Sequence, residues 1–398
     1  MAKAPLNGWG ESNASRARGF FLSSPSRPQG PRKSRRFHRP LPACLVLVAL
    51  AMLLPRGLTA QEVIEFSLPG GSGQPTGITA GPDGNLWLID WLGNIDRMTT
   101  GGVVTKFPVP PLVGQASSIA AGPDGSLWVA EWTKNKIGRM TTAGVWTEFS
   151  TPTASSGPET IVAGPDGAMW FTESGANKIG RMTTSGSCVE YPIPTASSSP
   201  LGLAVGPDGA LWFTETNRNK IGRMTTAGVV TAEYPMPPGG NSPRNIVAGP
   251  DGNLWFTEGP GNSIGRMTTS GVITEFPLPD TTRVFGITAG PDGNLWFTEF
   301  DNDKIGRITP AGEITEYPIP TSNCGAHSIT TGPDGNLWFT QFSTAQVGLI
   351  ILGVPPPPQI IQEFSLPGGS GQPTGITAGP DGNLWLIDWL GNIDRMTT

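Results

Sequence analysis

Short strand-like segments separated by turns recur along most of the chain. In one unit they occupy Gly286–Ala289, Asn294–Glu299, Lys304–Thr309 and Glu313–Pro318, and a Gly-Pro-Asp-Gly turn joins the first two. Aromatic and β-branched residues favour strands, whereas proline and glycine set the dihedral angles of turns. No window places apolar residues at the i, i+3, i+4 and i+7 spacing of a helix. Each unit therefore predicts four short antiparallel strands.

The Gly-Pro-Asp-Gly turn repeats at a nearly fixed interval, which points to one architecture. It begins at positions 81, 122, 164, 206, 249, 290, 332 and 379. A repeat of about 40–45 residues with four strands and a tryptophan is typical of a β-propeller blade. The second strand is apolar on both faces, as in Leu295-Trp296-Phe297, which suits a blade packed between two neighbours. The sequence predicts an all-β propeller of four-stranded antiparallel blades.

Two ways of closing the ring are open. Glu62–Pro69 matches the fourth strand of a blade, so it could complete the seventh blade and remove an open sheet edge. After the four prolines of Val354–Pro358, however, Glu363–Thr398 repeats Glu65–Thr100 identically over 36 residues. This duplicate could supply three strands of an eighth blade. We expect seven blades, because a proline run cannot donate the hydrogen bonds of a strand ladder, and keep eight as the alternative.

Charge and hydropathy divide the chain into three parts. Residues 1–60 contain ten Lys/Arg and one acidic residue, with the apolar run Leu41–Leu54 and then Ala60. A basic region, an apolar run too short to span a bilayer and a small residue are typical of a secretory signal. We expect 1–60 to be this leader, 61–354 the propeller, and 355–398 a proline-rich spacer with the duplicate of part of blade one. The protein would then be secreted, periplasmic or on the cell surface, and would contact a membrane only if the leader stayed uncleaved.

The residues after the leader exclude one class of partner. They include sixteen basic and thirty acidic residues, a net charge of −14, whereas nucleic-acid binding needs clustered Lys and Arg. Cys188 and Cys324 fall four blades apart. This is beyond the Cα separation of about 7 Å that a disulfide allows. We expect two free thiols, no metal bound by them, no nucleic-acid partner and a monomer.

One position in each blade varies although the repeat around it barely changes. It is the residue that enters the innermost strand, and hairpin geometry places it at the mouth of the central channel, opposite the Gly-Pro-Asp-Gly turns. We call these residues the entry ring: Thr76, Ser117, Glu159, Leu201, Arg244, Phe285 and His327. Unlike side chains on a uniform scaffold mark a place where a binding site is built, so we predict that this ring binds a small molecule or peptide. The alternative is a loosely packed position that varies freely.

The residues that leave the second strands behave in the opposite way. This exit ring is nearly uniform: Asp90, Glu131, Glu173, Glu215, Glu258, Glu299 and Gln341. Carboxylates can bind Mg²⁺ or Ca²⁺, and Glu159 and Glu299 are the candidates for metal ligands. Uniformity favours a structural role instead, in which each residue caps a loop or pairs with a lysine of its own blade (Lys136, Lys178, Lys220 or Lys304).

His327 is the only histidine after the leader. A histidine at a channel mouth can act as a general acid or base, because its pKa lies near neutrality. His327 is therefore the candidate catalytic residue, and the alternative is that it is one more residue of the rim.

The repeated units Gly-Ile-Thr-Ala-Gly-Pro-Asp-Gly-Asn-Leu-Trp-Phe-Thr-Glu and Asn-Lys-Ile-Gly-Arg-Met-Thr-Thr closely resemble the virginiamycin B lyase family over about 62–352 and again in the tail. The resemblance implies a seven-bladed propeller and a carbon–oxygen lyase that opens streptogramin B antibiotics by Mg²⁺-assisted elimination. It also implies two histidines and two glutamates in the last two blades. His327 matches the final histidine, whereas Phe285 and Gly325 replace the other histidine and the first glutamate, and Gln341 lies near the second.

These departures shape the expected function. Eliminating a proton next to a carbonyl needs a base and a cation or donors that stabilise the developing charge. A candidate base survives here without its carboxylates. We expect an exported lyase-like propeller that binds a small molecule or peptide with weak or no lyase activity. The alternatives are an active Mg²⁺-dependent lyase or related metal-dependent hydrolase, and an extracellular interaction module.

Overall fold

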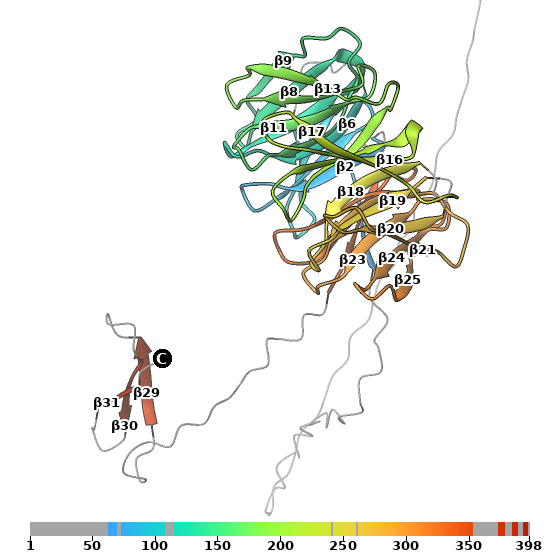
Figure 1. Cartoon of the computed structure of the whole chain (residues 1–398). Coiled ribbons are helices and arrows are strands. Elements are labelled where there is room, and N and C mark those ends of the chain that lie inside the picture. The colour runs from blue at the N-terminus through green and yellow to red at the C-terminus, as the bar shows by residue number, and fades with distance from the viewer. Residues whose placement is uncertain are drawn as a thin grey trace, which may run out of the picture. The chain divides into compact units, whose positions relative to one another are not determined.

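The computed structural model describes residues 63–69, 73–107, 115–239, 242–259 and 262–352, together with the backbone of 373–378, 384–388 and 393–396. Seven four-stranded antiparallel sheets follow one another as the blades of a propeller (Figure 1). The innermost strand of each blade contacts that of the next, and β2 (Pro75–Ala80) contacts β26 (Ala326–Thr331), so the ring is closed. The predicted seven-bladed, all-β fold is confirmed.

Each blade runs outward from the channel. The first strands are β2, β6 (Ala116–Ala121), β10 (Pro158–Ala163), β14 (Pro200–Val205), β18 (Pro243–Ala248), β22 (Val284–Ala289) and β26. The second strands are β3 (Leu86–Asp90), β7 (Ser126–Glu131), β11 (Met169–Glu173), β15 (Leu211–Glu215), β19 (Leu254–Glu258), β23 (Leu295–Glu299) and β27 (Leu337–Gln341). The third strands are β4 (Ile95–Met98), β8 (Lys136–Thr141), β12 (Lys178–Met182), β16 (Lys220–Met224), β20 (Ser263–Met267), β24 (Lys304–Ile308) and β28 (Gln346–Ile350). The fourth strands are β5 (Val104–Phe107), β9 (Trp146–Ser150), β13 (Cys188–Pro192), β17 (Val230–Pro235), β21 (Ile273–Pro277), β25 (Ile314–Pro318) and β1 (Val63–Ser67), and short 3-10 turns η1 (Trp132–Lys134) and η2 (Thr216–Arg218) follow β7 and β15.

The Gly-Pro-Asp-Gly repeat has a packing reason. In blade three, the indole Nε1 of Trp170 donates a hydrogen bond to Asp166 Oδ1 at 2.9 Å, and Arg181 donates to Asp166 Oδ2 at 2.7 Å. A Cβ atom at Gly164 would lie 2.3 Å from the Trp170 ring, so only glycine fits there. The other six blades repeat the aspartate–tryptophan bond. The turn thus orients a fully buried tryptophan in the core between blades.

The N-terminal strand closes the ring. β1 pairs antiparallel with β28, and Phe66 on β1 stacks on Trp338 with ring centroids 5.5 Å apart. Every other blade makes this stack within its own chain segment, as Trp170 does with Tyr191. Blade seven is therefore built from both ends of the propeller sequence, and β1 takes the outermost place that the fourth strand holds in the other blades.

The eight-bladed alternative is wrong, because β1 completes blade seven. The duplicate instead forms a separate three-stranded sheet of β29 (Pro373–Ala378), β30 (Leu384–Asp388) and β31 (Ile393–Met396). Its register repeats that of blade one, with Pro373 opposite Asp388 as Pro75 is opposite Asp90. An identical sequence thus forms the same three-stranded meander twice.

The leader 1–60 and the prolines of 354–358 lie outside the described residues, so the predicted domain boundaries stay predictions. Among the residues described, no helix is long and apolar enough to cross a membrane. Cys188 lies on β13 and Cys324 lies just before β26, and both are free thiols.

Candidate functional site

All seven residues of the entry ring line one cavity of about 540 Å³ inside the ring of first strands. Two residues further along each strand, aliphatic side chains line the same cavity: Ile78, Ile119, Ile161, Leu203, Ile246, Ile287 and Ile329. The volume lies within the range of sites that hold small molecules. The cavity therefore combines varied, partly polar groups at its mouth with an apolar interior.

A β-bulge in each first strand sets the position of its entry residue. In blade three, Pro158 pairs with the exit residue Glu173, but the next paired residue is Ile161, opposite Phe171. Glu159 therefore lies in an irregular step, where a bulge can redirect a side chain. The sequence argument placed each entry residue opposite the exit residue of its blade. In the structure the exit residue lies opposite the residue just before the entry residue, as Glu173 lies opposite Pro158.

Two members of the entry ring use their hydroxyl groups to join neighbouring blades. Thr76 Oγ1 donates to the carbonyl of Ala116 at 3.2 Å, and Ser117 Oγ donates to the carbonyl of Glu159 at 2.8 Å. Leu201 accepts a bond of the same kind from Thr172 Oγ1 at 2.8 Å, through its backbone carbonyl. These hydroxyls already have protein partners, so we assign the polar chemistry of the cavity to Glu159, Arg244 and His327.

His327 lies in an aromatic cluster. Its ring stacks on Phe285 at 4.8 Å and on Phe342 at 5.8 Å, and meets Phe300 edge-on at 6.3 Å. Phe342 in turn contacts Trp91 at 6.5 Å, and Trp91 lines the cavity. One side of the mouth is thus lined by Trp91, Phe285 and His327, which we call the aromatic wall, and Phe300 and Phe342 support it.

This environment keeps His327 neutral. Burial lowers the pKa of His327 to about 4, and the positive charge of Arg244 acts in the same direction. Nδ1 lies 2.9 Å from the carbonyl of Thr76, which can only accept, so Nδ1 carries the proton and Nε2 the lone pair. A group with a pKa near 4 is a weak base at neutral pH, well away from the value that favours proton transfer.

Glu159 and Arg244 are the two other titratable groups that line the cavity. Burial raises the pKa of Glu159 to about 7, although Ser174 Oγ donates to its Oε1 at 3.3 Å and opposes the shift. The Arg244 guanidinium lies 5.3 Å from the centroid of the Phe285 ring, and its buried Nε has no hydrogen-bond partner among the described residues. At neutral pH the permanent charge of the cavity is therefore that of Arg244.

The exit ring is buried between the blades, and one prediction about it is wrong. Its glutamates do not pair with the lysines of their own third strands, although Glu131 pairs with Lys134 of its own blade at 3.4 Å. Lys178 bonds to Glu190 at 2.7 Å and Lys304 to Glu316 at 2.6 Å, both on the fourth strands, and Lys136 and Lys220 likewise pair with Glu148 and Glu233. The fourth-strand carboxylates are less buried than the exit carboxylates, so the lysine ammonium stays hydrated. Asp90 does cap a loop, accepting hydrogen bonds from Asn94.

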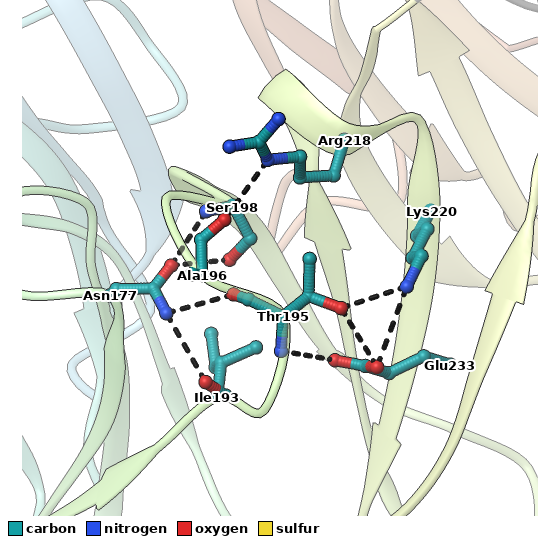
Figure 2. Close-up of polar contacts among 8 residues, drawn as sticks. All are labelled: Asn177, Ile193, Thr195, Ala196, Ser198, Arg218, Lys220 and Glu233. Atoms are coloured by element: carbon teal, nitrogen blue, oxygen red, sulfur yellow. Dashed lines mark hydrogen bonds and ion pairs between the residues drawn. The ribbon is translucent and has the colours of Figure 1, made fainter.

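Figure 2 shows what the lysine and the fourth-strand glutamate do together. The backbone N–H and hydroxyl of Thr195, in the linker that leads into blade four, donate to the carboxylate of Glu233 at 3.1 and 2.8 Å. Lys220 donates to the Thr195 hydroxyl at 2.8 Å. We call this threonine–glutamate contact the linker latch, because it fastens the linker to the outer strand of the blade that follows. Thr153 makes the same latch with Glu190.

The arrangement does not fit the Mg²⁺ site that the family resemblance implies. Among the described residues, no three His, Cys, Asp or Glu side chains gather where they could bind one metal ion. Glu159 lines the cavity, whereas Glu299 does not, and is fully buried with its pKa raised to about 7 by burial and by Glu316. The two candidate metal ligands are thus not brought together.

The positions carried over from the family are occupied by packing residues. Phe285 stacks on His327, and Gln341 is fully buried and hydrogen-bonded to Glu65. Gly325 has a φ of +62°, and a Cβ atom there would lie 2.8 Å from Ser343 Oγ and 3.1 Å from the Phe300 ring. A glutamate at 325 would therefore strain the backbone and displace its neighbours.

Sequence reasoning missed Trp91, Phe300 and Phe342. Each follows the last residue of a second strand, next to the exit ring. A signal was present, since this position holds five different residue types across the seven blades: Trp91, Trp132, Ser174, Thr216, Gly259, Phe300 and Phe342. The variable surface is therefore two residues wide at each blade, not one.

Known proteins of similar sequence share the fold of this chain. The model of the virginiamycin B lyase family matches residues 53–159 and 114–396. A streptogramin B lyase structure is 38% identical, covers 73% of this chain and 97% of its own, and superposes with a TM-score of 0.70. Virginiamycin B lyase from Staphylococcus aureus is also 38% identical, over 73% of this chain and 99% of its own, with a TM-score of 0.69.

A catalytically inactive histidine-to-alanine variant of the Staphylococcus aureus enzyme, solved with quinupristin, is 38% identical over 73% of this chain and 99% of its own, with a TM-score of 0.70. The comparison with curated proteins gives no match. The family model and the structures agree on fold and cover most of the propeller. The chain belongs to the virginiamycin B lyase family.

Proposed function

We propose that this chain is an exported member of the family that binds a small molecule or peptide at the channel mouth and has little or no streptogramin lyase activity. The binding half of the proposal rests on the cavity that the entry ring lines. A cavity of this size, with an apolar interior and few polar groups, is the form that small-molecule sites take. It favours a ligand site over a flat interaction surface.

The claim of little or no lyase activity rests on the stack of Phe285 on His327 at 4.8 Å. Proton abstraction needs a base whose pKa is near the working pH, and a charge or donors beside the developing anion. His327 is a weak base in this environment, and the ring beside it is a phenyl group that can neither donate a hydrogen bond nor bind a metal. The surroundings of His327 therefore support stacking rather than elimination.

Export and a monomeric state are further parts of the proposal. The basic leader and the apolar run Leu41–Leu54 favour export, and the negative charge of the propeller disfavours a nucleic-acid partner. We expect a monomer, because the fourth strands leave only short edges of four to six residues for pairing with another chain.

The test of activity is incubation of the purified protein with a streptogramin B, with and without Mg²⁺, followed by chromatographic separation of the cyclic and opened forms. We expect no ring opening. Mg²⁺-dependent opening that is lost in His327→Ala would show an active lyase and contradict the proposal.

The test of binding is ligand-observed NMR with a library of small aromatic and aliphatic compounds. Leu201→Trp places a large side chain in the cavity, and Val189→Trp adds the same ring at an exposed site on β13. We expect hits that Leu201→Trp abolishes and Val189→Trp keeps. A library without such hits would contradict binding at the mouth.

A further inference from the structure

Arg244 differs from every other arginine whose side chain the structure describes. Six of these form ion pairs with aspartates: Arg97, Arg139, Arg181, Arg223, Arg283 and Arg307. Arg218 and Arg266 donate to backbone carbonyls. The Arg244 side chain forms neither an ion pair nor a hydrogen bond with the described residues, and its Nε is buried without an acceptor. A buried donor without a partner is costly and calls for an explanation.

The neighbours of Arg244 are already engaged. Arg283 approaches the same Phe285 ring at 6.0 Å, but its guanidinium forms a bidentate pair with Asp301 at 2.6 and 2.9 Å. Glu159 bonds to Ser174 and does not reach Arg244. The protein thus holds Arg244 at the mouth, stacks it on an aromatic ring, and provides no carboxylate to neutralise it.

The groups around Arg244 define the rest of the ligand. Phe285, His327 and Trp91 form the aromatic wall on one side, and the ring of isoleucines and Leu203 lines the interior. An aromatic ring in the cavity could stack on the wall, where offset stacking adds to the burial of apolar surface. A planar guanidinium can donate two parallel hydrogen bonds to a carboxylate.

We propose that the cavity binds an aromatic carboxylic acid, with its carboxylate on the Arg244 guanidinium and its ring against the aromatic wall. This inference rests on the proposed function and names the ligand class for the same site. A single unpaired arginine matches one negative charge, whereas a phosphate dianion needs more donors than the cavity supplies. The carboxylate accepts from the terminal Nη groups of Arg244, since its Nε is buried within the protein.

The test uses calorimetric titration of the full chain with N-acetyl-L-phenylalanine. The matched probes are its primary amide, which keeps the ring and removes the charge, and acetate, which keeps the charge and removes the ring. We expect the acid to bind at least tenfold more tightly than the amide, and acetate to give no measurable binding.

Two variants separate a ligand contact from a structural role. Arg244→Met removes the donors at similar length, and Arg218→Met does the same at an exposed arginine outside the cavity. Arg244→Met should lose the preference for acid over amide while its melting temperature is unchanged or higher, because the guanidinium forms no hydrogen bond or ion pair in the free protein and methionine can keep the contact with Phe285. Arg218→Met should bind as the wild type does.

Other results would overturn the assignment. Equal affinity for acid and amide, or acid binding that survives Arg244→Met, would show that the ligand carboxylate does not bind Arg244. The proposal of a ligand site at the mouth would still stand. If neither N-acetyl-L-phenylalanine nor its amide binds, this ligand class is also rejected. The library screen with Leu201→Trp would then decide separately whether the mouth binds any ligand.

Discussion

Gln341 Nε2 donates a hydrogen bond of 2.7 Å to Glu65 Oε1, and thereby joins the exit ring of blade seven to the N-terminal strand. Glu65 also accepts the linker latch of blade seven, from the N–H and hydroxyl of Thr321 at 3.3 and 3.0 Å. Four other blades have an exit glutamate and a third-strand lysine. Blade seven has Gln341 and Gln346 at those positions, so an amide replaces a carboxylate where no lysine could balance it.

This contact gives the first prediction. Gln341→Glu would place two carboxylates together without a lysine, and should destabilise the protein by about 3 kcal/mol at pH 8, as uncompensated buried charges do. Urea unfolding measures the loss. The reciprocal change Glu65→Gln in the same chain should recover most of it, because the amide at 65 can donate to the carboxylate at 341. A Gln341→Glu protein as stable as the wild type would contradict the role of this bond.

The second prediction concerns ring closure. Phe66→Ala removes the stack on Trp338 and should cost about 2–3 kcal/mol in unfolding free energy. Phe364 occupies the identical position in the duplicate and gives a matched control, since β1 already completes blade seven. We expect Phe364→Ala to leave the unfolding midpoint unchanged. Equal losses in both variants would mean that the two copies exchange in closing the ring.

The third prediction is a pH optimum of stability near 5. Burial raises the pKa of Glu173 to about 8 and that of Glu131, Glu215 and Glu299 to about 7, with nearby fourth-strand glutamates adding to the shift. A carboxyl with a higher pKa in the folded state binds its proton more tightly there. The stability it confers is fully present below pH about 4.5 and is lost as the pH rises through 7 to 8, at up to about 1.4 kcal/mol per pH unit for each group.

The acid side of this optimum has a different source. Burial would raise the pKa of Glu190, but hydrogen bonds from Lys178 and Thr153 outweigh it and hold the pKa below its usual value. That contribution is present above the unfolded pKa and is lost as the pH falls below it. Urea midpoints from pH 4 to 9 would show the maximum. Glu173→Gln should flatten the alkaline limb, and an unchanged slope would contradict its elevated pKa.

The fourth prediction is that His327 does not titrate near neutrality. Its pKa is lowered to about 4, chiefly by burial, so its imidazole signals should stay constant between pH 5.5 and 8 in NMR spectra. Free histidine added to the same sample serves as the reference for the ordinary pKa value. Phe285→Ala opens the stack to water and should raise the His327 pKa toward 6.5. A wild-type midpoint near 6.5 would restore His327 as a candidate base.

Most of the fold could be predicted from the repeat. Three features contact one another within one blade: the Gly-Pro-Asp-Gly turn, the tryptophan four residues after its aspartate, and the third-strand arginine. Their spacing in the sequence therefore fixes how they lie in the structure. The position of the entry ring followed from the same local logic, because hairpin pairing fixes which rim a residue occupies. The closure by Glu62–Pro69 could also be recognised, since that segment resembles a fourth strand that lacks its own blade.

The pairing partners of individual side chains could not be predicted. The sequence indicated that lysines pair with exit glutamates, because the two are neighbours on one hairpin, but Lys178 turns to Glu190 and Thr153, the latter in the linker. From the sequence, Gln341 was interpreted as the loss of a carboxylate. The structure shows that its amide donates a hydrogen bond to Glu65, 276 positions away. The sequence indicated His327 without Phe300 and Phe342, whose rings reach it from two different blades.

By itself, therefore, the sequence determined the propeller, the number of strands in each blade and the rim on which seven unlike residues face the channel. The tertiary structure alone decided which of them are chemically available. Thr76 and Ser117 are engaged in bonds between blades, the pKa of His327 is lowered by burial, and Arg244 is left without a partner. The physical reason is that local spacing fixes backbone geometry, whereas the protonation and pairing of a side chain depend on burial and on charges brought close only when the ring closes.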